Sequence, residues 1–165
     1  AGYAASLAGV SDEAIVNGFK NFENAPHRLE PVREVNGAKY INDSKATNVD
    51  SVYYALDAVD APIVWIAGGV DKGNDYSLIQ ALVQNKVKGL ICLGIDNSKL
   101  FTAFENLVPS IQATDDLIKA IRMAKDLAAP GDTVLLSPAC ASFDLFKNYE
   151  DRGDQFREAV LAIEN

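Results

Sequence analysis

Short, continuously apolar runs are the feature that most constrains the fold of this chain. They read IVWIA, LICL and VLL, and each is followed by a loop that contains Gly or Pro. After each loop comes a stretch of helical character, such as YSLIQALVQN after the first run. Strands that are apolar on both sides are typical of a parallel sheet covered on both faces by helices. The pattern therefore predicts an α/β domain with a mostly parallel sheet.

The first 25 residues predict helices that precede this domain. Ser11 is a suitable N-cap, and Asp12 and Glu13 follow it in the first helical turn. We expect this helix to end near Asn24, before Pro26. Its apolar residues at helical spacing are Ile15, Val16, Phe19 and Phe22. The chain opens without Met in a helical pattern, so we expect it to be part of a longer protein.

A β-hairpin is predicted directly after this helical segment. The segments LEPVREV and AKYIN flank the dipeptide Asn36-Gly37. Asn-Gly is the strongest two-residue hairpin signal, because both positions of the tight turn need a positive φ. The predicted domain boundary therefore lies near Pro26, between the helices and the hairpin.

The charge balance narrows the class of partner. The chain has 165 residues and a net charge of −8, which disfavours binding to nucleic acid or to an anionic membrane. A small anionic ligand remains possible, since it needs only a local cationic pocket. Cys92 and Cys140 lie far apart and His27 is the sole histidine, so no metal site is predicted. No apolar stretch has the length of a membrane helix.

Ligands bind parallel sheets of this kind at the carboxyl ends of the strands. The loops that follow the predicted strands are NDSKATN, GGVDKGND, GIDNS and SPACASFD. In NDSKATN, the start of the next helix favours anions, and Lys45 adds a positive charge. The alternative is a simple helix cap, in which Asp43 or Ser44 caps and the other residues face water.

Two further segments carry candidate cations. GGVDKGND places Lys72 in a glycine-rich loop, but it matches neither GxxxxGK[ST] nor GxGxxG. The alternative is a glycine-rich turn with an exposed lysine. Arg28 could clamp a phosphate or carboxylate through two bonds, and His27 beside it could bind a ligand or pack.

In SPACASFD, Ser142 is expected to precede a helix, so that its hydroxyl and the following N–H groups could hold a carboxylate. Phe143, Phe146 and Tyr149 lie three apart, which is typical of core packing. Cys140 is disfavoured as a nucleophile, because no base accompanies it. The residues alone therefore indicate an α/β domain with an anion-binding cleft and do not specify a reaction.

Taken in order, the segments PHRLE, NGAKYINDSKATN, GGVDKG and LLSPACASFDLFKNYEDRGDQF resemble the C-terminal domain of the Mur ligase family. The resemblance runs from about Pro26 to the C-terminus, and residues 1–25 look like the last helices of a central ATPase domain. It implies a Rossmann-like three-layer α/β domain, residues 26–165, that starts with a β-hairpin. It also implies a cytoplasmic, monomeric enzyme of peptidoglycan synthesis.

The implied reaction joins D-glutamate to UDP-N-acetylmuramoyl-L-alanine with ATP and Mg. ATP phosphorylates a substrate carboxylate, and the amine of D-glutamate attacks the resulting acyl phosphate. By the same resemblance, Arg28 and Asp43 bind the nucleotide. His27 lies close to the reacting groups, and Lys45 faces the active site, so both are catalytic candidates.

The resemblance assigns a second set of residues to D-glutamate. Thr47 and Lys72 hold one of its carboxylates, and Ser142 contributes a hydroxyl. The backbone of Phe143 and Tyr149 supplies the remaining contacts. The chain contains no P-loop, so we expect it to be inactive by itself.

Three other interpretations compete with this one. A folylpolyglutamate synthetase-like ligase domain shares the architecture, but it is not expected to carry the SPACAS run. A non-enzymatic α/β anion-binding module would be complete as it stands. A nicotinamide-dependent oxidoreductase is disfavoured, because GxGxxG with a downstream acidic residue is absent.

Overall fold

The computed structural model describes residues 1–21 and 24–164 of the chain. The strands are β1 (Glu30–Val35), β2 (Ala38–Asn42), β3 (Ile63–Gly68), β4 (Val87–Leu93), β5 (Ile111–Thr114) and β6 (Thr133–Ala139). The helices are α1 (Gly2–Leu7), α2 (Asp12–Lys20), α3 (Val49–Ala58), the short 3-10 helix η1 (Tyr76–Ile79), α4 (Gln80–Lys86), α5 (Ser98–Phe104), α6 (Leu117–Leu127) and α7 (Tyr149–Leu161).

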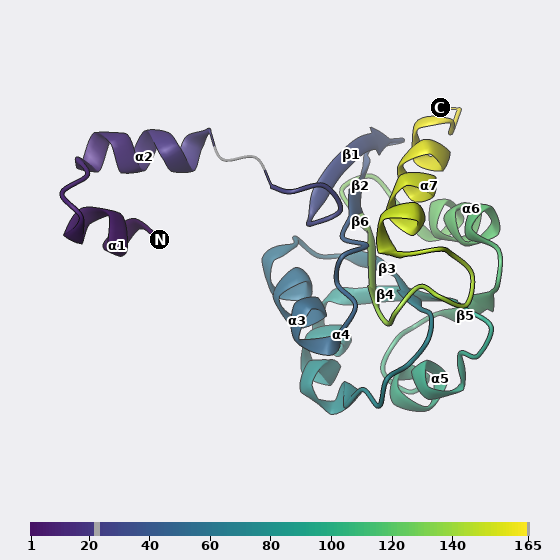
Figure 1. Ribbon diagram of the computed structural model, residues 1–165. Helices are drawn as coiled ribbons and strands as arrows, with labels where there is room; N and C mark the ends of the chain where they lie inside the picture. The colour runs from purple at the N-terminus through teal and green to yellow at the C-terminus, as the bar shows by residue number, and fades with distance from the viewer. Residues whose placement is uncertain (22–23, 165) are drawn as a thin grey trace.

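The strands form one sheet in the order β1-β2-β6-β3-β4-β5 (Figure 1). Only the pair β1–β2 is antiparallel, and the other neighbouring strands run parallel. The predicted α/β fold with a mostly parallel sheet is therefore confirmed. Because the parallel strands all point the same way, the loops after β2, β6, β3 and β4 meet at one edge of the sheet.

The predicted hairpin is also confirmed. Asn36 and Gly37 have φ angles of 50° and 79°, the positive values that a type I′ turn requires. Strand β2 then pairs in parallel with β6, with Tyr40 opposite Val134. The hairpin is thus the edge of the main sheet, because its second strand is shared with the parallel part.

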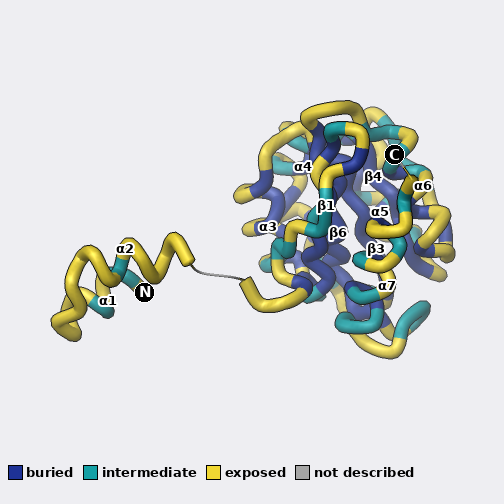
Figure 2. Tube along the Cα trace, turned by 90° about the horizontal axis from the view of Figure 1, so that it is seen from above, coloured by how far each residue is buried: buried dark blue, intermediate teal, exposed yellow. Residues whose placement is uncertain are grey.

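Strand β3 shows why the apolar runs are continuous. Successive side chains of a strand point to opposite faces of the sheet. Ile63, Trp65 and Ala67 lie in one core cluster, against α3, α4 and α5. Val64 and Ile66 lie in the other, against α6 and α7. Both faces are therefore buried under helices, and Figure 2 shows the buried strands at the centre of the body.

The helices before the sheet agree in part with the sequence. Ser11 caps α2 as predicted, since its hydroxyl accepts a hydrogen bond from the Ala14 N–H at 3.3 Å. The helix ends at Lys20 rather than near Asn24, and Asn21, a poor helix former, is its C-cap. Phe22, which was assigned to its apolar face, lies outside the described residues. No residue of α1 or α2 is buried, and Figure 1 draws the pair apart from the sheet.

Among the residues that the structure describes, no helix is both long enough and apolar enough to cross a bilayer.

Candidate functional site

The end of strand β2 builds the first part of the site. Asn42 is fully buried, and its side-chain amide donates to Glu30 Oε2 and to the Gly153 carbonyl, both at 3.1 Å. The same nitrogen lies 3.1 Å from His27 Nδ1, and the side-chain oxygen of Asn42 (Oδ1) accepts from the Ser44 N–H. One amide side chain therefore joins strand β2 to the segment before β1 and to helix α7.

His27 is held in a fixed position against α7. It is 5% exposed and has a φ of 62°. Its backbone N–H donates to Glu30 Oε2 at 2.8 Å. Its ring meets the Tyr149 ring edge-on, with centroids 6.2 Å apart. A Cβ at Gly153 would collide with the imidazole, so only glycine lets the helix approach this closely. The histidine is packed rather than free to swing.

Asp43, the residue after β2, is buried with a carboxylate whose two oxygens are both engaged. Oδ1 accepts from the Leu29 N–H at 3.2 Å, and Oδ2 accepts from the Ser137 hydroxyl at 2.8 Å. Burial raises the pKa of Asp43 to about 6, and these hydrogen bonds and the charge of Arg28 only partly oppose the rise. Arg28, Asp43 and Lys45 line one cavity of about 250 Å³, together with the exposed ring of Tyr54.

Lys45 and Tyr149 lie side by side, although the sequence pointed to different roles for them. The Lys45 ammonium donates to the Tyr149 hydroxyl at 3.2 Å and sits 5.1 Å from the centre of its ring. A cation over an aromatic face is attracted to it. The Tyr149 carbonyl in turn accepts from the Ser44 hydroxyl at 2.7 Å. The loop after β2 and the start of α7 therefore form one unit.

The remaining predicted residues lie on loops that are joined to each other. Val70 and Ala141 pair as an antiparallel bridge, with N–H to carbonyl distances of 2.8 and 3.1 Å. This bridge brings the loop of Lys72 next to the loop of Ser142. Lys72 is exposed, whereas Ser142 is buried. Thr47 is half-buried and directly precedes Asn48, the N-cap of α3.

Two local predictions about helix starts are wrong. The cap of α3 is Asn48, which accepts from the Ser51 N–H at 2.8 Å, and not Asp43 or Ser44. Both of those residues are buried at the sheet edge instead, since β2 ends directly before them. The segment NDSKATN holds several residues of types that cap helices, and their spacing alone does not decide which one caps.

The second correction concerns the segment after Ser142. No helix begins there: the Ser142 carbonyl closes a turn by accepting from the N–H groups of Leu145 and Phe146. Helix α7 starts at Tyr149, with Asn148 as its cap. The free N–H groups of a helix start therefore lie near Tyr149 rather than next to Ser142. Phe143 was expected to pack in the core, but it is 69% exposed in this turn.

Sequence reasoning missed Arg152 on α7. Its side chain is 1% exposed, and its Nε donates to the Ser44 hydroxyl at 3.0 Å. The guanidinium also donates to the carbonyls of Ser44 (2.9 Å), Cys140 (3.3 Å) and Gly68 (3.5 Å). Burial lowers the pKa of Arg152 to about 10. This one side chain thus links the ends of β2, β6 and β3, and an arginine inside an acidic helical segment carried no signal of this.

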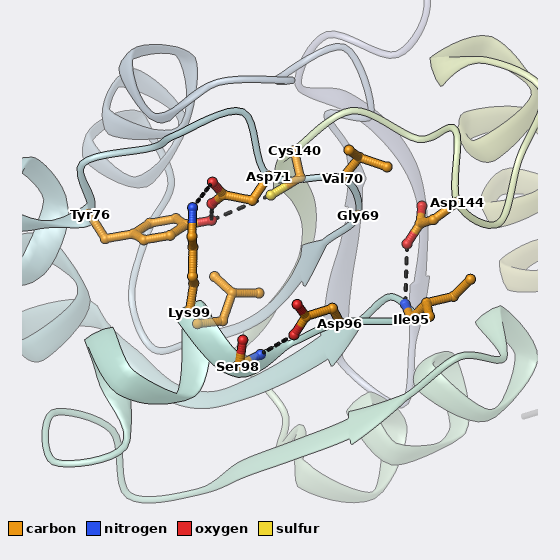
Figure 3. Close-up of a pocket in the computed structure, with 11 residues that line it drawn as sticks. Gly69, Val70, Asp71, Tyr76, Ile95, Asp96, Ser98, Lys99, Cys140 and Asp144 are labelled. Atoms are coloured by element: carbon orange, nitrogen blue, oxygen red, sulfur yellow. Dashed lines mark hydrogen bonds and ion pairs between the residues drawn. The ribbon is translucent and has the colours of Figure 1, made fainter.

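A second cavity, of about 370 Å³, lies at the ends of β3 and β4 (Figure 3). Asp71 and Tyr76 line one side of it, and Lys99 reaches toward them from α5. Cys140 lies at the same cavity, and burial raises the pKa of its thiol. Within the described residues, no group of three or more His, Cys, Asp or Glu side chains is arranged to hold a metal ion.

Fold and site together define a class: a three-layer α/β domain whose cationic and hydroxyl side chains gather on loops at one sheet edge. A family model described as "Mur ligase, glutamate ligase domain" matches residues 27–140. The chain therefore belongs to the Mur ligase family, as the resemblance of its motifs indicated.

Two curated relatives carry the same name. The UDP-N-acetylmuramoylalanine--D-glutamate ligase of Cytophaga hutchinsonii is 57% identical over 160 residues, and that of Porphyromonas gingivalis is 54% identical. Both alignments cover 97% of this chain and 36% of the relative, so the chain spans little more than a third of their length. A crystal structure of the bifunctional folylpolyglutamate synthase/dihydrofolate synthase of Yersinia pestis has a TM-score of 0.61 at 20% identity, covering 93% of this chain and 35% of that one. At that identity it supports the fold alone.

Proposed function

We propose that this chain is the C-terminal, amino-acid-binding domain of a ligase that joins D-glutamate to UDP-N-acetylmuramoyl-L-alanine. The reaction consumes ATP and proceeds through an acyl phosphate. The observation that carries the proposal is the 57% identity over 160 residues to a ligase of that name. The arrangement of the strand-end loops supports it, because cationic and hydroxyl groups of separate loops converge at one sheet edge.

The D-glutamate site is proposed to lie between the bridged loops and the start of α7. Lys72 is exposed, and none of the described residues pairs with its ammonium, so its charge is available to a carboxylate. Thr47 and Ser142 would add hydroxyl groups, and the backbone N–H groups at Phe143 and Tyr149 would complete the site. The helix start at Tyr149 favours an anion, since its N–H groups and dipole both point outward.

Arg28 and Asp43 are proposed to hold the nucleotide in the cavity of about 250 Å³ that they share. The guanidinium is suited to phosphate oxygens, and the carboxylate is suited to a sugar hydroxyl. Bound ATP supplies the phosphoryl group that activates the acceptor carboxylate, and Mg balances the phosphate charge. Lys45 also lines this cavity, and His27 precedes Arg28 in the chain; both are proposed to face the reacting groups.

Residues 1–25 are proposed to be the end of a central ATPase domain, and residues 26–165 to be the C-terminal domain. Exposed apolar side chains on α1 and α2 support this division, among them Tyr3 (80% exposed), Leu7 (73%) and Phe19 (61%). Such side chains are normally covered in a complete protein. We further propose that the intact ligase is a cytoplasmic monomer.

Replacing Lys72 with alanine in the intact ligase tests the substrate assignment. A charge-assisted hydrogen bond contributes about 1.5–3 kcal/mol, so KM for D-glutamate should rise roughly 10- to 100-fold. KM for ATP should stay the same, because the nucleotide is bound by other residues. Steady-state kinetics of phosphate release measure both constants. Lys119→Ala on α6 is the matched control, and unchanged D-glutamate kinetics in Lys72→Ala would remove the assigned role.

Residues 1–165 by themselves are expected to release no phosphate from ATP when D-glutamate and UDP-N-acetylmuramoyl-L-alanine are supplied. The physical reason is that the chain has no P-loop to cradle the transferred phosphoryl group. A coupled phosphate assay checks this, with the intact ligase as the positive control. Substrate-dependent phosphate release from residues 1–165 would contradict the proposal that phosphoryl transfer needs a further domain.

A further inference from the structure

The loop that carries Lys72 is organised around a single carboxylate. Asp71 Oδ1 accepts hydrogen bonds from the N–H groups of Gly73 (2.7 Å) and Asn74 (3.2 Å), which folds the chain tightly around Lys72. Asp71 Oδ2 accepts from the Tyr76 hydroxyl at 2.9 Å. Gly73 and Asn74, which follow Lys72, are therefore fixed to the side chain of Asp71, which precedes it, while Lys72 is exposed.

This carboxylate is also anchored to the rest of the domain. Lys99 of α5 donates to Asp71 Oδ1 at 2.5 Å (Figure 3). Tyr76 is buried, and its ring packs edge-on against the ring of Phe104, which like Lys99 is in α5, with centroids 5.5 Å apart. Asn74 donates its side-chain amide to the Ala139 carbonyl at 3.0 Å, at the end of β6. The loop is thus tied both to α5 and to the neighbouring strand.

The charges at this position favour a ligand on Lys72. Asp71 and Lys72 are adjacent in the chain, and an unpaired Asp71 carboxylate would partly cancel the Lys72 ammonium. Lys99 neutralises Asp71 instead. Burial by itself would raise the pKa of Asp71, but the bonds from Lys99, Gly73, Tyr76 and Asn74 outweigh it and hold the pKa at about 2. Asp71 therefore remains charged near neutral pH.

We propose that Asp71 is a positioning residue for amino-acid recognition: it holds the Gly69–Asp75 loop so that the Lys72 ammonium meets a carboxylate of D-glutamate. The proposal rests on the proposed function, since Lys72 is assigned to D-glutamate there. Asp71 does not touch the substrate and acts only through Lys72. It follows that removal of Asp71 should impair amino-acid binding and leave the nucleotide site intact.

The test is steady-state kinetics of the intact ligase with variants of Asp71. Asp71→Ala loses every bond of the carboxylate, and we expect KM for D-glutamate to rise about tenfold with kcat and KM for ATP within about threefold. Asp71→Asn keeps an oxygen for the N–H groups of Gly73 and Asn74, so it should restore most of the affinity. Asp96→Asn is the matched control, because it removes an exposed carboxylate from the rim of the same cavity.

A double-mutant cycle shows whether Asp71 works through Lys72. If it does, adding Asp71→Ala to a Lys72→Ala enzyme should change KM for D-glutamate by less than about twofold, because the positioned group is already gone. Multiplying effects in the double variant would overturn the proposal. So would an Asp71→Ala enzyme whose D-glutamate KM equals that of the wild type, or one in which both KM values rise equally.

The two proposals can fail separately. If the wild-type ligase releases no phosphate on addition of D-glutamate, the proposed function fails. Loop order is then read by amide hydrogen exchange of the same intact protein. Protection of the Gly73 and Asn74 amides should be lost in Asp71→Ala and retained in Asp96→Asn. Unchanged protection in Asp71→Ala would overturn the positioning role by itself, whatever the enzyme's substrate.

Discussion

Replacing Arg152 with methionine is expected to lower the free energy of unfolding of this chain by about 3 kcal/mol. Methionine fills much of the same volume but donates no hydrogen bond. The buried carbonyls of Ser44 and Cys140 would then lose their donor, as would the Ser44 hydroxyl. Removing from the interior a charge that is unpaired among the described residues offsets part of this loss, which keeps the expected figure near the lower end of the range for breaking a buried charged interaction.

Urea unfolding followed by circular dichroism measures the effect of Arg152→Met. Arg122→Met on the exposed face of α6 is the matched control and should stay within about 0.5 kcal/mol of the wild type. Arg152→Lys keeps the charge but lacks the planar guanidinium. Its free energy of unfolding should therefore lie between those of Arg152→Met and the control. A loss below about 1 kcal/mol for Arg152→Met would mean that the strand ends hold their positions without the guanidinium.

Stability should also depend on pH through Asp43, in a direction opposite to that of most carboxylates. The pKa of Asp43 is raised from 3.8 to about 6 in the folded chain. The folded state therefore holds this proton more tightly than the unfolded state does. The contribution of Asp43 to stability is complete below about pH 4, falls as the pH rises, and is lost above about pH 6. Two pKa units correspond to about 3 kcal/mol.

Asp43→Asn isolates this contribution, because the amide keeps the shape of the side chain and does not titrate. The difference in unfolding free energy between wild type and Asp43→Asn should shift by about 2 kcal/mol against the wild type between pH 4 and pH 6.5, because this window covers most of the titration. Asp96→Asn, at an exposed position, should show no such shift. Parallel stability curves for wild type and Asp43→Asn would contradict a raised pKa, as would an NMR titration of the Asp43 carboxyl with a midpoint near 4.

Much of the fold follows from local patterns. The run IVWIA can be buried on both faces only inside a covered parallel sheet, and β3 shows this alternation residue by residue. Asn36-Gly37 specifies a tight turn because few other residue pairs adopt two positive φ angles. Ser11 specifies a helix start because its hydroxyl reaches the N–H three residues ahead. Each of these signals acts over a few residues, so the sequence contains it completely.

The candidate site was predictable only as a set of loops. NDSKATN, GGVDKGND and SPACASFD follow strands, and a parallel sheet brings strand ends together. Which residue of each loop does what did not follow from spacing. Asn48 rather than Asp43 caps α3, and a turn rather than a helix follows Ser142. Competing polar groups within one loop differ by about 1 kcal/mol or less, too little for the sequence to rank them.

The sequence by itself determined the layers of this protein, its hairpin, the sheet edge where its candidate loops meet, and its family. Only the tertiary structure decided that Arg152 joins three strand ends, that Lys45 rests on Tyr149, and that Asp71 organises the loop of Lys72 with help from Lys99. The partners of Arg152 and Lys45 lie up to 108 residues away in the chain. Hydrogen bonds and ion pairs reach only a few ångströms, so such partners exist only after the sheet has brought its strand ends together.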